Sequence, residues 1–344
     1  MSEREGAQDV EELRRGLHAL VEDVEPRGDA LARVLSARQR RSRRAPRRPL
    51  LAAGGLAVAA AAAVVVALVP AQQGQPQRAE PVSVAPNSYV AATGSSVAAF
   101  DVLSGQRVRE LGELGGPVRG ALVADGQQVY ARVAAGGGED VVRISPDGEL
   151  ARVRHLAAPS PVLAAAGGNV AVLEPSGVVI SGAGPERRIA VPAGMQVLDL
   201  ALAPDGRVAV LTAEAGGNRI RVVPPGAAAL DQPPMPVVGV CGPLAIDFSG
   251  ADLATLSPLC GGGADGRVRI STLDGATGQP LGAGVPFAAG GPADAQRVQL
   301  SADRLGRFLV SAGTGQWLVD EAVVRQVPPA CATTCATTPA TFWG

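Results

Sequence analysis

Residues 198–211 read LDLALAPDGRVAVL, which is two apolar runs separated by Ala-Pro-Asp-Gly. An Asp-Gly pair between apolar runs is a strong signal for a β-hairpin turn. The chain repeats this signal, and its 44 glycines and 28 prolines suit many tight turns. We therefore predict an all-β domain of short strands. The other Asp-Gly pairs are Asp125-Gly126, Asp147-Gly148, Asp265-Gly266 and Asp274-Gly275.

A short apolar strand motif recurs along the same region. Its successive starting points are 40, 41, 38, 45 and 55 residues apart, and a period near 40–45 residues is typical of β-propeller blades. We predict about six blades, with room in the last interval for an inserted loop or a seventh, degenerate blade. A two-sheet sandwich is the alternative, but it would show no such repeat. The motif begins at Tyr89, Val129, Val170, Val208, Leu253 and Phe308.

These motifs also carry a family resemblance. Residues 198–211 resemble the Ala-Pro-Asp-Gly hairpin of WD40-like and TolB-like propellers, and residues 142–148 share part of it. Residues 97–106 are similar to an outer strand and turn of the same blades. The Trp-Asp and Gly-His pairs of strict WD40 repeats are absent. The whole chain resembles actinobacterial single-pass membrane proteins that carry an extracytoplasmic propeller.

Leu50–Val69 is an unbroken apolar run of 20 residues between two prolines. As a helix it would be about 30 Å long, which matches the hydrocarbon core of a bilayer. Seven arginines lie just before the run, within residues 38–48, whereas the first basic residue after it is Arg78. The positive-inside rule then places the N-terminus in the cytoplasm. The seven are Arg38, Arg40, Arg41, Arg43, Arg44, Arg47 and Arg48.

Two other interpretations of this run are a buried globular helix and a cleaved signal peptide. The arginine flank argues against the first. The 48 preceding residues and the length of the run argue against the second. We therefore predict a lipid-embedded anchor at residues 49–70, a polar linker at 71–81 and an extracytoplasmic propeller at 82–344.

Residues 1–48 are predicted to form a short helical cytoplasmic segment. Val10, Leu13, Leu17 and Leu20 follow helical spacing and form one apolar stripe. The segment is either a marginal hairpin near the membrane or a docking helix for a cytoplasmic protein. Membrane-tethered anti-sigma factors have short cytoplasmic segments of this kind, but no zinc-binding cluster accompanies His18.

The four cysteines all lie on the predicted outer side, where oxidation is permitted. Cys241 and Cys260 flank a predicted hairpin, so we expect a disulfide between them. Cys331 and Cys335 enclose three residues and are candidates for a second disulfide. A structural zinc site needs four ligands, and no histidine accompanies these cysteines, so no metal site is predicted.

The sequence predicts no catalytic residue and no cofactor. It contains no G-x-S-x-G elbow, P-loop or H-E-x-x-H motif, and the predicted outer domain has one histidine, His155. Asp101, Asp199 and Asp247 follow related apolar strands; they either line a central channel or make ordinary turn hydrogen bonds. Phe342-Trp343 is expected to pack against the last blade.

The leading functional hypothesis is a non-enzymatic module that binds a protein, peptide or envelope component outside the cell. A net charge of −1, without a basic face, argues against nucleic-acid binding. The alternatives are transmembrane signalling through residues 1–48, as in an anti-sigma-like regulator, and a hydrolase or lyase on a propeller scaffold that would use His155.

Overall fold

The computed structural model describes residues 87–343, apart from 127, 183, 261–265, 290–297, 313–314, 329 and 331–340. The predicted cytoplasmic segment, membrane span and linker lie outside these residues, as do Cys331 and Cys335. Within the described ranges, no helix is both long and apolar enough to span a bilayer.

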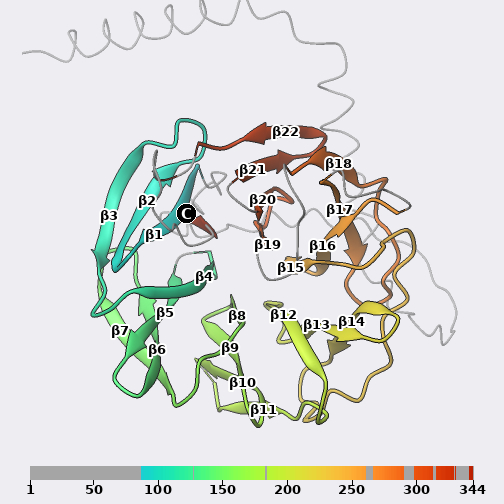
Figure 1. Cartoon of the computed structure of the whole chain (residues 1–344), viewed down its shortest axis with the longest axis horizontal. Helices are drawn as coiled ribbons and strands as arrows, with labels where there is room; N and C mark the ends of the chain where they lie inside the picture. Colours follow the sequence, from blue (N-terminus) through green and yellow to red (C-terminus); the bar gives the residue numbers. More distant parts are fainter. Residues whose placement is uncertain are drawn as a thin grey trace, which may run out of the picture. The chain divides into compact units, whose positions relative to one another are not determined.

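Six antiparallel sheets surround a common axis as the blades of a propeller (Figure 1). Strands are given from the axis outward. Blade I contains β23 (Thr341–Trp343), β1 (Ser88–Thr93), β2 (Ser96–Asp101) and β3 (Arg107–Glu113). Blade II contains β4 (Val118–Ala124), β5 (Val129–Ala135), β6 (Gly138–Ile144) and β7 (Leu150–Leu156). Blade III contains β8 (Leu163–Ala166), β9 (Asn169–Glu174), β10 (Gly177–Gly182) and β11 (Arg187–Ile189).

The second half of the ring follows the same plan with one shorter blade. Blade IV contains β12 (Gln196–Leu202), β13 (Val208–Glu214) and β14 (Gly217–Val223). Blade V contains β15 (Ala245–Ser249), β16 (Asp252–Pro258), β17 (Arg267–Asp274) and β18 (Val285–Ala288). Blade VI contains β19 (Val298–Ala302), β20 (Phe308–Ala312), β21 (Gly315–Asp320) and β22 (Val323–Gln326).

The predicted repeat coincides with the blades. Its six starting points fall on β1, β5, β9, β13, β16 and β20, which are the second strands of the six blades. The long last interval holds β17, β18 and β19, and the described residues form no seventh sheet. The prediction of an all-β propeller is confirmed, with six blades.

Blade I closes the ring by joining both ends of the described chain. The C-terminal strand β23 pairs with β1, so that Tyr89 lies opposite Phe342 and Val90 opposite Thr341. Strand β23 accordingly lies beside β1 (Figure 1). Phe342 was expected to pack against the last blade. Phe342 is on a strand of blade I and does pack against blade VI: it shares an apolar cluster with Leu309 and Leu318, and the Arg307 guanidinium lies 5.4 Å from its ring centre.

The hydrophobic core is divided among the blade interfaces. Six apolar clusters each join two neighbouring blades; in one of them Val90 and Leu111 of blade I pack with Leu122 and Ile144 of blade II. Strands in the middle of a blade are therefore covered on both faces. This explains why they read as continuous apolar runs such as Val208–Leu211 rather than as alternating patterns.

Arginines form polar contacts between blades at the ends of the strands. All 31 basic residues of the chain are arginine. The guanidinium of Arg207 in blade IV lies 5.4 Å from the ring centre of Phe248 in blade V, and Arg307 repeats this contact on Phe342. Arg187 of blade III donates to the Gly206 carbonyl of blade IV at 2.8 Å. Each contact spans a blade interface, so it adds to the apolar packing there.

Blade IV has three strands, and residues 232–235 lie along the edge that a fourth would cover. The Met235 N–H donates to the Ile220 carbonyl of β14 at 2.7 Å, and Arg221 of β14 donates to the Gln232 carbonyl at 2.5 Å. Met235 itself is buried. Prolines at 233, 234 and 236 have no N–H for a strand ladder, which suits a segment that covers an edge without extending the sheet.

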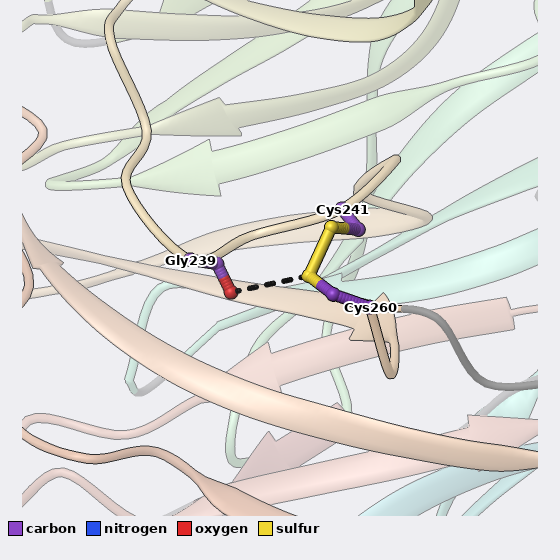
Figure 2. The surroundings of a disulfide bond; sticks show 3 residues. All are labelled: Gly239, Cys241 and Cys260. Carbon is purple, nitrogen blue, oxygen red and sulfur yellow. Dashed lines mark hydrogen bonds between the residues drawn. A yellow bond between two sulfur atoms is a disulfide. The ribbon is translucent and has the colours of Figure 1, made fainter.

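Cys241 and Cys260 form a disulfide, as predicted (Figure 2). The bond lies at the open end of the β15–β16 hairpin, where the Leu244 N–H donates to the Leu256 carbonyl at 2.7 Å. The Gly239 carbonyl oxygen lies 3.7 Å from Cys260 Sγ. The disulfide therefore ties the segment that connects β14 to β15 to the far end of β16 in blade V.

Replacing both cysteines, as C241S/C260S, is expected to lower the free energy of unfolding by about 3 kcal/mol, because a loop of this length gains entropy when it is opened in the unfolded chain. Urea unfolding of the full chain in detergent, without reductant, measures the difference. Equal unfolding midpoints and slopes for the two proteins would contradict a stabilising role.

Candidate functional site: the central channel

The inner strands enclose a cavity of about 460 Å³ on the propeller axis. On the side of blades II and III its wall consists mainly of small apolar residues, such as Ala121, Ala164 and Ala165. On the side of blades IV, V, VI and I it carries hydrogen-bonding side chains. These are Gln196, Asp199, Asp247, Gln299, Ser301 and Thr341.

Asp199 on β12 and Asp247 on β15 make matching hydrogen bonds to the backbone. Asp199 accepts from the N–H of Leu200 at 2.9 Å and from the N–H of Ile246 in blade V at 2.9 Å. Asp247 accepts from Phe248 at 2.8 Å and from Ala302 in blade VI at 2.7 Å. Each carboxyl thus joins its own strand to the inner strand of the next blade.

Of the three aspartates grouped by the sequence, Asp101 lies elsewhere. It ends β2, where its Oδ1 accepts from the N–H and the hydroxyl of Ser104 at 2.7 and 2.8 Å. Its counterpart is Asp274 at the end of β17, which accepts from the N–H and hydroxyl of Thr277 at 2.8 and 2.9 Å. The channel prediction therefore fails for Asp101 and is met by Asp199 and Asp247.

The two channel carboxyls have strongly perturbed acidities. Burial raises the pKa of Asp199 to about 7, and the nearby charge of Asp247 adds to this rise. Burial raises the pKa of Asp247 to about 7 as well. The backbone N–H groups that both accept favour the ionised form and act in the opposite direction. Both carboxyls are therefore poised to change charge near neutral pH.

These shifts predict that the propeller loses stability as the pH rises from 5 to 8. A carboxyl whose pKa is higher in the folded state than the usual 3.8 holds its proton more tightly when folded. Its contribution to the free energy of unfolding is fully present below about pH 4 and is lost as the pH rises through about 7. At about 1.4 kcal/mol per pKa unit, each group contributes up to a few kcal/mol over this window.

Urea unfolding at pH 5 and pH 8 tests this dependence in the wild type and in D199N and D247N. The quantity compared is the change in the free energy of unfolding between pH 5 and pH 8. The absolute free energy is not used, because asparagine also disturbs the two accepted hydrogen bonds. D274N is the matched control. The Asp274 carboxylate of the wild type also accepts hydrogen bonds from nearby groups, but it lies at the surface and these bonds lower its pKa. A change equal to that of the wild type in both channel variants would contradict the assignment.

The remaining polar groups of the channel also join blades. Gln299 on β19 donates to the Leu122 carbonyl of β4 at 2.7 Å. The Ser301 hydroxyl lies 3.0 Å from that of Thr341 on β23 and accepts from the Phe342 N–H at 3.3 Å. These contacts fix the inner strands with respect to one another. The channel is thus a preformed cavity whose wall is held by hydrogen bonds.

A buried ion pair forms part of the channel wall where blades II and III meet, and Arg132 is one of the lining residues. Arg132 on β5 is 5% exposed and Glu139 on β6 is 6% exposed; their Nη1 and Oε2 atoms are 3.4 Å apart. Glu139 also accepts from the Ser160 N–H at 3.3 Å, and Arg132 donates to the Pro161 carbonyl at 3.4 Å. Burial lowers the pKa of Arg132, while the charge of Glu139 opposes that shift. Sequence reasoning missed this pair; the signal was an arginine within the apolar run Val129–Val133.

His155, the histidine of the predicted outer domain, is not in the channel. It lies on β7, the outer strand of blade II, and its Nδ1 is 2.7 Å from Asp140 Oδ1. Its side chain is 47% exposed. The lining of the channel contains neither histidine nor cysteine. A hydrolase mechanism that used His155 as its base would have to operate on the outer rim of blade II.

No protein-family model matches the sequence, and no curated protein matches it. Among solved structures, TolB from Acinetobacter baumannii is similar with a TM-score of 0.50 and 10% identity, over 74% of this chain and 65% of TolB. Apo AztD from Citrobacter koseri has a TM-score of 0.43 and 10% identity, over 74% of this chain and 96% of AztD. A putative 6-phosphogluconolactonase from Bacteroides uniformis has a TM-score of 0.41 and 14% identity, over 74% of this chain and 83% of the other. At these identities the likeness concerns the fold alone, so we conclude that the described residues form a TolB-like six-bladed β-propeller.

Proposed function

We propose that the chain is a membrane-anchored, extracytoplasmic propeller that binds a protein, peptide or envelope component without catalysing a reaction. The observation that carries this proposal is the central channel. Its volume of about 460 Å³ lies in the range of binding pockets, and its wall is preformed by hydrogen bonds between blades. Preformed walls reduce the entropy lost when a ligand binds.

The polar groups of the channel favour binding over catalysis. Asp199 and Asp247 are engaged by backbone N–H groups, and Ser301 is engaged by Thr341 and Phe342. A nucleophile activated for catalysis would instead be hydrogen-bonded to a base that is itself oriented by a third group. Within the part of the chain that the structure describes, the channel holds no such arrangement.

The proposed location rests on the sequence and on the disulfide. The apolar run Leu50–Val69 with its arginine flank supports an anchor whose C-terminal side faces outward. The Cys241–Cys260 disulfide supports an oxidising compartment for the propeller.

Photocrosslinking from inside the channel tests the binding role. A benzoylphenylalanine at position 196, which is exposed and lines the cavity, is expected to form a discrete adduct in intact cells. The same residue at position 325, on the outer strand β22, is the control. An adduct at 196 that is absent at 325 supports a channel ligand. Identical adducts at both positions, or none at 196, would refute it.

A second candidate function is signalling through the cytoplasmic side. It is favoured by the apolar stripe of Val10, Leu13, Leu17 and Leu20. Purification of the full chain from crosslinked cells should then recover a cytoplasmic protein, and L13E/L17E should abolish its recovery. Recovery that is unchanged in this variant would exclude the stripe as the docking surface.

A further inference from the structure

A second cavity, separate from the channel, lies between blades II and III. This groove has a volume of about 620 Å³. Blade II contributes Tyr130 from β5, Arg143 from β6 and residues 151–154 from β7. Blade III contributes Gly168, Val170, the end of β10 and, beyond it, Gly184 and Glu186. On the blade III side, glycines at positions 168, 182 and 184 contribute no side chains to the lining.

The three arginines of the groove are in different states. Arg154 is neutralised, with Nε 2.5 Å from Glu174 and Nη1 2.6 Å from Glu186. Arg152 is paired with Asp140 at 3.7 Å and is largely exposed. Arg143 forms no ion pair and no side-chain hydrogen bond with any described residue. It is therefore the guanidinium that is free to bind a ligand.

Arg143 also has a defined position. It is the cross-strand partner of Tyr130, a residue that is 2% exposed. Opposing side chains on neighbouring strands lie about 5 Å apart at Cβ, so the arginine stem lies over a rigid aromatic residue. Burial raises the pKa of Tyr130 to about 12 although the charge of Arg143 works in the opposite direction, which places the two groups within electrostatic range.

The groove also contains one carboxylate, Glu186, whose charge is offset by Arg154 at 2.6 Å and Arg188 at 2.9 Å. Two further side chains beside Arg143 can donate hydrogen bonds. The Ser181 hydroxyl accepts from Arg154 Nη1 at 3.2 Å, and its own proton has no acceptor among the described residues. The Gln128 carbonyl accepts from the Tyr130 hydroxyl at 3.2 Å, which leaves its amide nitrogen for other partners. Oxyanions match a surplus of donors around a guanidinium, because two parallel N–H groups can bind two oxygens of a carboxylate or phosphate.

We propose that the groove between blades II and III binds a small ligand through an oxyanion, carboxylate or phosphate, seated on Arg143. This site is independent of the channel and goes beyond the binding role proposed for it. The neutral part of the ligand would extend past Gly184 into the open side of the groove. A methyl group added at Gly184 would meet no heavy atom within 4 Å, so this position can be filled without disturbing the fold.

Titration calorimetry with the full chain in detergent tests the site, with inorganic phosphate, D-glucuronate and the neutral methyl glucoside as probes. We expect saturable binding of at least one anion and none of the neutral sugar. R143Q should weaken anion binding at least about tenfold, as expected for the loss of charge-assisted hydrogen bonds. Phosphate binding without glucuronate binding would assign a phosphate site, and the reverse a carboxylate site.

Matched variants separate the groove from general effects. G184L should block glucuronate by filling the groove, whereas G136L, at a turn with equally open space, should not. R325Q removes an exposed arginine from blade VI and should leave binding unchanged. The proposal is overturned if neither anion binds saturably, if R143Q binds as the wild type does, or if the neutral sugar binds as well as the anions. Channel crosslinking from position 196 does not depend on any of these outcomes.

Discussion

A chain that ends at residue 340 is expected not to fold, because it lacks the strand that closes the ring. Removing β23 leaves β1 without its inner partner and removes Phe342, which is 5% exposed, from the cluster between blades VI and I. It also removes the Ser301–Thr341 contact between inner strands. Deleting a buried phenylalanine side chain alone costs about 3–5 kcal/mol, against a total stability of about 5–15 kcal/mol.

Circular dichroism and urea unfolding of the truncated and complete chains measure this effect. F342L is the graded comparison: it keeps an apolar side chain in the cluster but loses the ring beneath Arg307. We expect it to fold with a loss of about 1–2 kcal/mol, since leucine fills most of the volume and the cation–π contact is modest. A truncated chain as stable as the complete one would show that closure does not depend on β23.

Replacing Glu139 by alanine is expected to destabilise the propeller by about 3–5 kcal/mol, because it leaves the Arg132 charge buried without a partner. The Arg132 guanidinium would keep its contact with the Pro161 carbonyl at 3.4 Å but would lose its counter-charge. Urea unfolding at pH 7 is the measurement.

Two comparisons make the Glu139 result specific. E110A breaks the ion pair of Arg107 and Glu110, which has a shorter distance of 2.8 Å but is more than half exposed on both sides. It should change stability by less than about 1 kcal/mol. The double replacement R132M/E139M should recover much of the loss, because it removes both buried charges. Equal effects of E139A and E110A would contradict the role given to burial.

The propeller could be predicted because each blade contains the same short apolar motif within a few consecutive residues. The apolar motif falls on the second strand of every blade, which is covered on both faces and so must be apolar throughout. Three of the turns predicted from Asp-Gly pairs lie between paired strands: Asp125-Gly126, Asp147-Gly148 and Asp205-Gly206. The open end of one hairpin likewise allowed the Cys241–Cys260 pairing to be predicted.

The channel was only partly predictable, because its wall comes from strands that are far apart in the sequence. Asp199 and Asp247 were identified as candidates, but their partners Ile246 and Ala302 donate backbone N–H groups that carry no sequence signal. A second repeat was also missed. Asp101-Val-Leu-Ser-Gly-Gln and Asp274-Gly-Ala-Thr-Gly-Gln form the same turn after third strands.

The glycine of this second repeat explains why the Asp-Gly pattern was misleading there. The residue with positive φ is Gly278, at +72°, rather than Gly275. A Cβ at Gly278 would also approach Met235 within 2.5 Å. Comparing the two six-residue stretches would have placed Asp101 with Asp274 instead of with the channel residues.

The proposed function depends most directly on which side of the membrane the propeller occupies. A pair of reporters fused after Gly344 of the intact chain, one active only outside the cytoplasm and one only inside, measures this. We predict activity from the outside reporter alone, and reversal when the seven arginines at positions 38–48 are replaced by glutamine and a cluster of arginines is placed in the linker at residues 71–81. Activity from the inside reporter in the unaltered chain would contradict an extracytoplasmic binding propeller.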